Sequence, residues 1–316
     1  MEIKKVVVAG GGVLGSQIAY QCAYCGYDVT IWLRSEGSIT RTQPKLDNLR
    51  KVYADTISFM ATKEGKSYEN WARGIADYDH FDKAECLEKS ENAYSSIKLE
   101  LDLSKAVKDA DVVIESMAED MAQKKAFYQK LSPLMDEKTI LLTNSSTLLP
   151  SKLAKFTGRS DRFLALHFAN SIWKNNTAEV MAQPKTDPKY FDVIMEFAQS
   201  IRMIALPVKK EKSGYLLNSM LVPFLFSGMD LFVNGISDPE SIDKAWTLGT
   251  GAPEGPFRIL DVVGLKTAYN IVNMYVKIPS FLAPYNFKGM AKMLKEYIDK
   301  GKLGKSSGEG FYKYDN

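Results

Sequence analysis

The 316-residue sequence has few of the residues that metal sites and disulfide frameworks use. It contains three cysteines and two histidines, and an odd number of cysteines argues against a framework of paired disulfides. Cys22 and Cys25 form a Cys-x-x-Cys pair, but they lie in a predicted helix without a second pair or a nearby histidine. We therefore interpret them as ordinary small helix residues and expect no metal site.

The sequence also lacks a strong charge of either sign and a long uninterrupted apolar run. The net charge is +3 and no basic cluster is present, so we expect neither nucleic acid nor a membrane as a partner. The most apolar stretch, 215–233, is interrupted by Asn218, Pro223 and Asp230, which favours a buried or interface helix over a membrane span. Because the first residues lead directly into a β-like run, we expect no secretory signal and a reduced, cytoplasmic protein.

What the sequence does contain, close to its start, is a glycine-rich turn between a strand and a helix. Residues 3–9 predict a strand, 16–25 a helix and 29–33 a second strand, with Gly-Gly-Gly-Val-Leu-Gly at 10–15. In this context Gly-x-Gly-x-x-Gly is the pattern of a dinucleotide-binding loop: the glycines allow a tight turn, close approach of pyrophosphate and close helix packing. The amides at the helix N-terminus favour phosphate. We expect contacts to the cofactor from Gly10, Gly12, Val13, Leu14 and Gly15.

The end of the second predicted strand bears on which dinucleotide is bound. A site that prefers NAD usually has Asp or Glu there to bind the ribose hydroxyls, whereas this sequence has Leu33 followed by Arg34. Arg34 could pair with the 2′-phosphate of NADP, stack on adenine, or lie in solvent. We predict that Leu33 and Arg34 border an NAD or NADP site, with Arg34 favouring NADP.

Strands and helices alternate through the first two thirds of the chain. Further strands are predicted at 111–115, 139–143 and 162–167, with a helix at 121–135, and this alternation predicts a doubly wound parallel sheet. After Pro207 only helical patterns follow. We therefore expect an α/β, Rossmann-type dinucleotide-binding domain over 1–207 and a smaller all-α domain over 208–316 for substrate binding and dimerisation.

Residues 35–95 interrupt the alternation. Leu46, Leu49, Tyr53, Ile57 and Met60 are spaced three or four apart, which predicts one face of a long helix. A second helix is predicted at 68–76. We expect a helical excursion at the edge of the sheet that either packs on it or covers a substrate.

The two histidines differ in their surroundings. His80 lies in a polar segment and is predicted to be at the surface. His167 ends a predicted strand, at the edge where doubly wound sheets bind their ligands. Glu179 follows twelve residues later, and Ser146 follows the preceding predicted strand. His167 is therefore the candidate for acid–base chemistry near neutral pH.

Several motifs, in order along nearly the whole chain, resemble those of the 3-hydroxyacyl-CoA dehydrogenase family, and most closely its bacterial diketoreductase members. They are the glycine loop at 10–15, Thr-Asn-Ser-Ser-Thr-Leu-Leu-Pro at 143–150, Leu-His-Phe-Ala-Asn at 166–170, Asn-Asn-Thr-Ala-Glu-Val-Met at 175–181, Gly-Tyr-Leu-Leu-Asn at 214–218, Gly-Thr-Gly-Ala-Pro-Glu-Gly-Pro-Phe at 249–257 and Gly-Glu-Gly-Phe-Tyr at 308–312. Several such motifs together are far more specific than the glycine loop alone.

The resemblance implies a role for each matching residue. His167 would be the general acid and base for reduction and oxidation, and Glu179 would orient its ring and favour its protonated form. Ser146 and Asn218 would hydrogen-bond the reacting oxygen. Cofactor contacts are implied for Glu119, Lys124, Ser146 and Asn170. The resemblance also implies a homodimer.

The sequence departs from the family pattern near the expected substrate pocket. Phe-Ala-Asn-Ser at 168–171 replaces the usual Phe-Asn-Pro after the histidine, and Ser213 and Ser306 stand where Pro and Lys are common. These changes leave open whether the substrate is a 3-hydroxyacyl-CoA thioester or a free keto ester or acid. Trp173 could be a pocket wall or a packing residue.

Two alternatives to this reading follow from the same resemblance. One is a sugar-acid, gulonate-type dehydrogenase, which shares the fold and the His–Glu pair. The other is a non-catalytic dinucleotide-binding protein that resembles the λ-crystallins. The presence of Ser146, His167, Glu179 and Asn218 together counts against the second alternative, because a structural role needs none of them.

Overall fold

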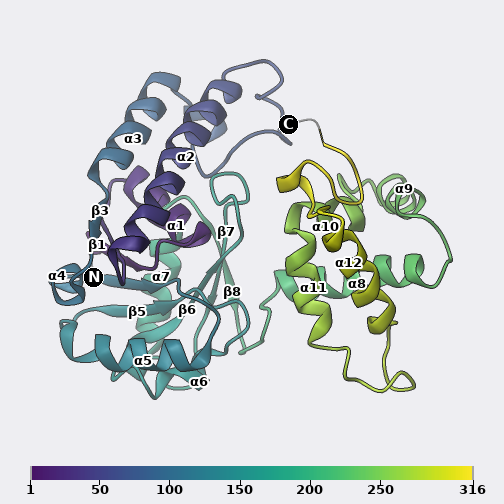
Figure 1. Ribbon diagram of the computed structural model, residues 1–316. Helices are drawn as coiled ribbons and strands as arrows, with labels where there is room; N and C mark the ends of the chain where they lie inside the picture. The colour runs from purple at the N-terminus through teal and green to yellow at the C-terminus, as the bar shows by residue number, and fades with distance from the viewer. Residues whose placement is uncertain (1, 315–316) are drawn as a thin grey trace. The chain divides into compact units, whose positions relative to one another are not determined.

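The computed structural model describes residues 2–314. They form two compact units that divide between Leu216 and Leu217 (Figure 1). The first unit is α/β and the second is all-helical, so the predicted fold class is confirmed. The predicted boundary after residue 207 falls inside the last strand, β8 (Ile204–Val208), and the first unit continues for several residues beyond it.

One sheet with strand order β3-β2-β1-β4-β5-β6-β7-β8 forms the centre of the first unit. Its strands are β1 (Lys5–Ala9), β2 (Asp28–Trp32), β3 (Lys98–Glu100), β4 (Val112–Glu115), β5 (Ile140–Thr143), β6 (Phe163–Phe168), β7 (Thr177–Met181) and β8. All neighbouring strands are parallel except β6 and β7.

The antiparallel β7 and the short β3 and β8 were not predicted from the sequence. Residues 169–176 connect β6 to β7 and are too few for a parallel crossover, which needs about a dozen or more residues. The chain therefore reverses direction, and this reversal places β7 directly beside β6.

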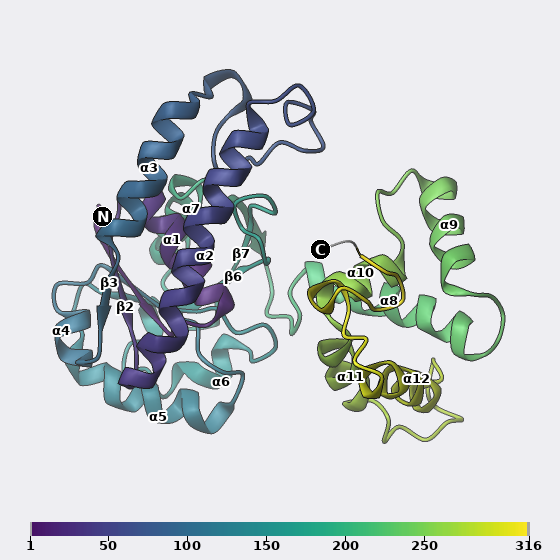
Figure 2. The same ribbon diagram turned by 45° about the horizontal axis from the view of Figure 1, so that its top comes forward.

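Seven α-helices belong to the described part of the first unit: α1 (Val13–Tyr24), α2 (Glu36–Met60), α3 (Lys83–Ser96), α4 (Leu103–Val107), α5 (Met121–Leu131), α6 (Pro150–Ala154) and α7 (Pro188–Ser200). Short 3-10 turns lie at Tyr78–His80, Ser132–Leu134 and Ser160–Arg162. The long helix predicted from the apolar spacing is α2, which buries all five predicted residues together with Thr42. It packs side by side with α3 (Figures 1 and 2).

The helix predicted at 68–76 is wrong, because this segment consists of turns. Trp71 and Ile75 are buried, which explains the misleading apolar spacing. However, the Gly74 N–H donates to the Trp173 carbonyl, and a Cβ on Gly74 would lie 2.8 Å from Trp173 backbone atoms. This long-range backbone contact prevails over the local helical pattern, and the next helix, α3, begins only after Asp82 caps it.

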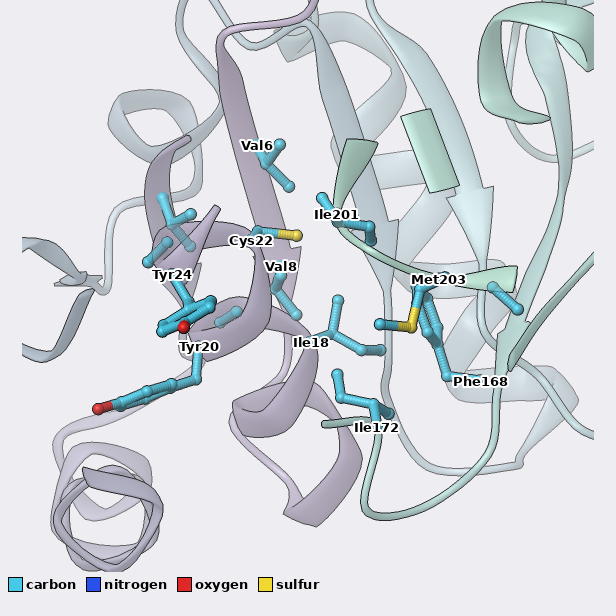
Figure 3. Packing of buried hydrophobic residues seen from close by; sticks show 14 of the residues in the cluster. Val6, Val8, Ile18, Tyr20, Cys22, Tyr24, Phe168, Ile172, Ile201 and Met203 are labelled. Carbon is cyan, nitrogen blue, oxygen red and sulfur yellow. The ribbon is translucent and has the colours of Figure 1, made fainter. Parts of the chain in front are cut away.

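The central strands are buried on both faces, as expected for a parallel sheet with helices on each side. Figure 3 shows Ile18 and Cys22 of α1 packed near Val6 and Val8 of β1. Phe168 belongs to the same core cluster, whereas Ala165 lies in a different cluster with Met181. Side chains alternate along β6, so His167 lies on the face opposite to α1.

The second unit consists of α8 (Leu217–Val233), α9 (Pro239–Thr250), α10 (Pro256–Val263), α11 (Leu265–Asn273), α12 (Phe287–Asp299) and a 3-10 turn at Lys305–Ser307 (Figure 2). Two buried aspartates connect its motifs. Asp243 accepts hydrogen bonds from the amides of Phe257 (2.8 Å) and Arg258 (3.0 Å). Asp261 accepts from the amides of Phe311 (2.8 Å) and Tyr312 (2.9 Å). Within residues 2–314 no helix is long and apolar enough to cross a membrane.

Candidate active site

The glycine loop connects β1 to α1, and its three motif glycines differ in their steric surroundings. Gly10 has φ +120°, and a Cβ there would lie 2.6 Å from the Ser116 carbonyl oxygen. A Cβ on Gly15 would lie 2.1 Å from the Gly10 carbonyl oxygen, so α1 approaches the loop as closely as glycine allows. At Gly12 a Cβ would meet nothing within 4 Å, so this position faces open space.

The N-terminus of α1 fits a phosphate. Gly12 is its N-cap, no side chain caps it, and no acidic residue lies in its first turn. Val13 is 63% exposed in this turn, and Leu14 is half-buried. Open space beside uncapped amides is the cradle that a pyrophosphate needs, so the residues present fit a dinucleotide.

At the end of β2 the two predicted cofactor neighbours differ in exposure. Leu33 is buried, and its Cδ2 would lie 2.9 Å from a Cβ on Gly11. Arg34 is exposed and is followed by Ser35, the N-cap of α2, whose hydroxyl lies 3.1 Å from that of Ser38. The acidic residue nearest in sequence is Glu36, in the first turn of α2.

His167 and Glu179 face each other across the one antiparallel strand pair. They are register partners on β6 and β7, and His167 Nδ1 lies 2.9 Å from Glu179 Oε2. Both side chains are buried, so the carboxylate interacts with the ring in a medium of low dielectric constant. On the other side of the ring, Nε2 lies 3.1 Å from Ser146 Oγ, which follows β5. The structure thus brings together three residues that are distant in the sequence.

Tyr215 also belongs to this cluster, although it was not predicted as a site residue and was noted only as part of the motif at 214–218. Its ring stacks on His167 with centroids 4.4 Å apart and planes inclined by 12°. Its hydroxyl donates to the Ser145 carbonyl oxygen (2.7 Å), and the next amide, Leu216 N, donates to Glu179 Oε1 (2.8 Å). Burial raises the pKa of Tyr215, and the nearby carboxylates of Glu119 and Glu179 raise it further, so the hydroxyl remains a donor.

Of the predicted cofactor contacts, Glu119 lies at the loop that carries Ser146, and Lys124 lies close to Glu119. Lys124 is fully buried, with Nζ 2.6 Å from Glu115 Oε1 and 3.8 Å from Glu119 Oε2. Lys124 therefore interacts with two carboxylates at this edge of the sheet, and its own side chain is not exposed there. Asn170 is exposed, and its carbonyl accepts from Asn175 Nδ2 (3.0 Å).

Glu115 was not predicted from the sequence, where it is one of many acidic residues. It ends β4, is fully buried, and its second oxygen accepts from Tyr128 (2.7 Å) and Thr143 (2.9 Å). The signal that could have identified it is its place: a carboxylate at the end of an otherwise apolar strand must have buried partners. Asn218, the remaining predicted site residue, lies on α8 in the second unit, so its contact with the reacting oxygen stays a prediction.

A hollow of about 640 Å³ lies elsewhere in the first unit, between the turns at 66–78 and the start of β8. Trp71, Arg73 and Arg202 are among its lining residues, and none of the predicted site residues is. Met203, which also lines it, packs in the core cluster on the α1 side of the sheet, whereas His167 is on the other face. Volume alone therefore does not identify the reactive site.

A dinucleotide loop and a Glu–His–Ser series of hydrogen bonds at one edge of a doubly wound sheet define an oxidoreductase-type site. Known protein families agree with this class. Residues 5–212 match the family model "3-hydroxyacyl-CoA dehydrogenase, NAD binding domain", and residues 214–314 match "3-hydroxyacyl-CoA dehydrogenase, C-terminal domain". The chain therefore belongs to the 3-hydroxyacyl-CoA dehydrogenase family, and it is an oxidoreductase that acts on CH–OH groups.

Individual relatives span almost the whole chain. Mitochondrial hydroxyacyl-coenzyme A dehydrogenase of Homo sapiens is 31% identical, covering 99% of this chain and 91% of its own length. The 3-hydroxybutyryl-CoA dehydrogenase of Clostridioides difficile is 30% identical, covering 98% of this chain and 99% of its own. Among solved structures, a diketoreductase described as acting on dicarbonyl compounds is 45% identical with a TM-score of 0.84, covering 99% of this chain and 100% of its own.

Proposed function

We propose that this enzyme interconverts a 3-keto and a 3-hydroxy group with a nicotinamide dinucleotide, using His167 and Glu179 as its acid–base pair. The observation that carries the proposal is the series of contacts from Glu179 Oε2 to His167 Nδ1 (2.9 Å) and from His167 Nε2 to Ser146 Oγ (3.1 Å). A bound nicotinamide supplies the hydride in reduction and accepts it in oxidation.

In this proposal Glu179 fixes the orientation and the protonation of the imidazole ring. Its Oε2 accepts from Nδ1–H, and its Oε1 is held by the Leu216 amide (2.8 Å), so the carboxylate cannot rotate away without losing both bonds. The negative charge favours a proton on the ring. Nε2 is then the atom that exchanges a proton with the substrate.

Ser146 and His167 act on the same substrate oxygen. During reduction the proton on His167 Nε2 passes to the carbonyl oxygen as hydride reaches the carbon, which leaves a neutral imidazole and a hydroxyl group. During oxidation the neutral Nε2 takes the hydroxyl proton. The Ser146 hydroxyl, which lies 3.1 Å from Nε2, donates a hydrogen bond to the oxygen and holds it near the ring.

For the substrate we propose a free keto ester or acid with two carbonyl groups, in preference to a CoA thioester. The support is the higher identity to the diketoreductase, 45%, than to the human hydroxyacyl-coenzyme A dehydrogenase, 31%. The sequence departures after His167 and at Ser213 point the same way. Trp173, considered above as a pocket wall, packs against Tyr53 with ring centroids 5.6 Å apart.

For the cofactor, the matching family model is an NAD-binding domain. We propose that Arg34 in addition allows use of NADP, because it is exposed at the end of β2 where no carboxylate stands. We also propose that the enzyme is a homodimer, supported by the exposed apolar side chains of its second unit.

The test is an assay of NADH and NADPH against a free diketo ester, acetoacetyl-CoA and a keto sugar acid. We expect the highest kcat/KM with the free diketo ester. His167→Gln should lower kcat by at least about a hundredfold and leave dinucleotide binding intact. His80→Gln is the matched control, because His80 is exposed in the turn Tyr78–His80. Near-normal turnover by His167→Gln would refute the acid–base assignment, and preference for the thioester or the sugar acid would replace the substrate.

A further inference from the structure

The loop 145–148 carries Ser146, and one carboxylate holds this loop on both sides of the serine. Glu119 Oε1 accepts from Ser145 Oγ (2.6 Å) and, beyond Ser146, from Thr147 N (2.8 Å), Thr147 Oγ1 (2.7 Å) and Leu148 N (3.2 Å). Ser146 itself is not among these donors. Burial alone would raise the pKa of Glu119, but the hydrogen bonds from Ser145 and Thr147 outweigh it and lower the pKa. The carboxylate is therefore charged at neutral pH.

Tyr215 holds the same loop from a different part of the chain. Its hydroxyl donates to the Ser145 carbonyl oxygen (2.7 Å), immediately before Ser146, while its ring lies on the His167 ring. The residue is almost fully buried and has φ +53°, a left-handed conformation that a tyrosine adopts only where the surroundings fix it. One side chain thus contacts both partners of the Ser146–His167 hydrogen bond.

The carboxylate that holds the loop is itself anchored in the core. The other oxygen of Glu119, Oε2, lies 3.8 Å from Lys124 Nζ. Lys124 is fixed by Glu115 (2.6 Å), whose position is set by the Tyr128 and Thr143 hydroxyls and by the Met117 amide (2.7 Å). Buried hydrogen-bonded networks of this kind restrain the side chains that form them. The loop is therefore connected to the ends of β4 and β5 through side chains and not only through its backbone.

We propose that Glu119 and Tyr215 are positioning residues that keep Ser146 Oγ within hydrogen-bonding distance of His167 Nε2. This inference rests on the proposed function, because it concerns the same Ser146 and His167. Neither residue needs to touch the substrate. They increase the fraction of molecules in which the serine hydroxyl and the imidazole are both placed to bind the same substrate oxygen.

The first experiment compares two conservative variants with matched controls. Tyr215→Phe keeps the ring and removes the hydroxyl, and Glu119→Gln keeps the shape and removes the charge. Each should lower kcat by about fivefold, the value of one net hydrogen bond, with the dinucleotide KM changed less than about twofold. The controls are Tyr24→Phe, a buried tyrosine that donates to the Ile75 carbonyl (3.2 Å), and Glu100→Gln, whose carboxylate accepts from two amides (both 2.8 Å).

A raised dinucleotide KM with unchanged kcat in Glu119→Gln would overturn the positioning role of Glu119 and identify it as a cofactor contact instead. If Glu119→Gln fails to fold, Ser145→Ala removes one of its donors and is expected to lower kcat in the same way.

The second experiment asks whether the two residues act through Ser146. In a Ser146→Ala background there is no hydroxyl to position, so Tyr215→Phe and Glu119→Gln should each change kcat less than about twofold. A merely structural role would give the same loss in both backgrounds, and that result would overturn the proposal.

The third experiment does not depend on turnover. The chain has only two histidines, so the imidazole nitrogen NMR signals of His167 can be assigned against those of His80. We expect the Nε2 signal of His167 to move in Tyr215→Phe and Glu119→Gln and to stay in place in both controls. An unmoved signal together with normal kcat would refute the positioning role alone. If the signal moves in these variants but His167→Gln has near-normal turnover, the positioning role stands and the acid–base assignment is refuted.

Discussion

The proposed use of NADP rests on one residue, Arg34. It is exposed after β2, and the hydroxyls of Ser35 and Ser38 lie close to each other in the same turn. A guanidinium can bind the 2′-phosphate of NADP through two parallel hydrogen bonds, and NAD has no phosphate at this position. We expect Arg34→Ala to lower kcat/KM for NADPH by about tenfold or more and for NADH by less than about twofold.

Arg50→Ala provides the control for this substitution, since Arg50 is an exposed arginine on α2 that pairs with Glu91 (2.6 Å). Equal losses with both dinucleotides in Arg34→Ala would mean that Arg34 does not distinguish them and would remove the support for NADP.

Asp111 shows how one carboxylate at the opposite edge of the sheet adds stability that depends on pH. Burial alone would raise its pKa, but the hydrogen bond from Lys138 (2.6 Å) and those from the amides of Lys5 and Lys4 (both 2.9 Å) outweigh it and lower the pKa. Because the pKa is lower in the folded state, its contribution is present above the unfolded value of about 3.9 and is lost as the pH falls through the folded pKa.

For Asp111→Asn we therefore expect a loss of about 1–2 kcal/mol in the free energy of unfolding at pH 7. The difference from the unsubstituted protein should shrink as the pH falls below about 4. Urea unfolding at several pH values measures this, with Asp192→Asn, an exposed aspartate on α7, as the control. A difference that stays constant down to pH 3 would contradict the stated cause.

Individual residues of the site were predictable to different degrees. His167, Glu179 and Ser146 were predictable, because they occupy motif positions of the family and His167 lies one residue before the end of an apolar strand. Tyr215 was not, since its stacking on His167 depends on how a segment far along the chain returns to the sheet. Lys124 was predicted as a cofactor contact, but its burial against Glu115 depends on the packing of α5 on β4, which has no local signal in the sequence.

At the scale of elements, the β1–loop–α1 unit depends on glycine at positions where a Cβ has no room. Gly15 is in a helix and lacks room for a Cβ, which would lie 2.1 Å from the Gly10 carbonyl oxygen. We expect Gly15→Ala to destabilise the protein by more than about 2 kcal/mol and to weaken dinucleotide binding, because α1 must move away from the loop. Denaturant unfolding and a dinucleotide titration measure the two effects.

Gly249 offers the matched comparison, since it is also helical, in α9, but a Cβ there would meet nothing within 4 Å. Gly249→Ala should stabilise the protein by about 0.5–1 kcal/mol. If Gly15→Ala behaved like Gly249→Ala, close packing at Gly15 would not be the reason for glycine there.

Elements with strong local periodicity were predicted well, and elements set by long-range pairing were not. The apolar spacing of Leu46, Leu49 and Tyr53 identified α2, because a single buried face determines it. In the segment 68–76 the helical spacing of Trp71 and Ile75 was misleading, because the long-range contact between Gly74 and Trp173 determines the backbone there. The strand β7 has no helical or alternating apolar pattern of its own. Glu179 in β7 looks like a surface charge in the sequence, and only the pairing with β6 buries it against His167.

At the scale of the whole molecule, the second unit has more exposed apolar surface than its size explains. Of the seventeen large hydrophobic side chains that are exposed in residues 2–314, ten lie in this shorter unit. Leu248 is 84% exposed, Phe281 85% and Met220 67%. A contiguous exposed apolar patch marks an interaction site, and we expect Leu248 and Phe281 to belong to one. A second copy of the chain is the partner that the proposed homodimer supplies.

We therefore expect the protein to sediment at twice its chain mass at micromolar concentration. Leu248→Lys and Phe281→Lys should each shift the equilibrium toward monomer, while Tyr68→Lys, at a tyrosine 80% exposed in the first unit, should not. In a two-fold symmetric dimer every substitution occurs twice, so each lysine places two charges in the interface, and burying unpaired charge there costs several kcal/mol. Sedimentation velocity measures the result. A monomer at all accessible concentrations would refute the homodimer, because one copy would then leave this apolar surface in contact with water.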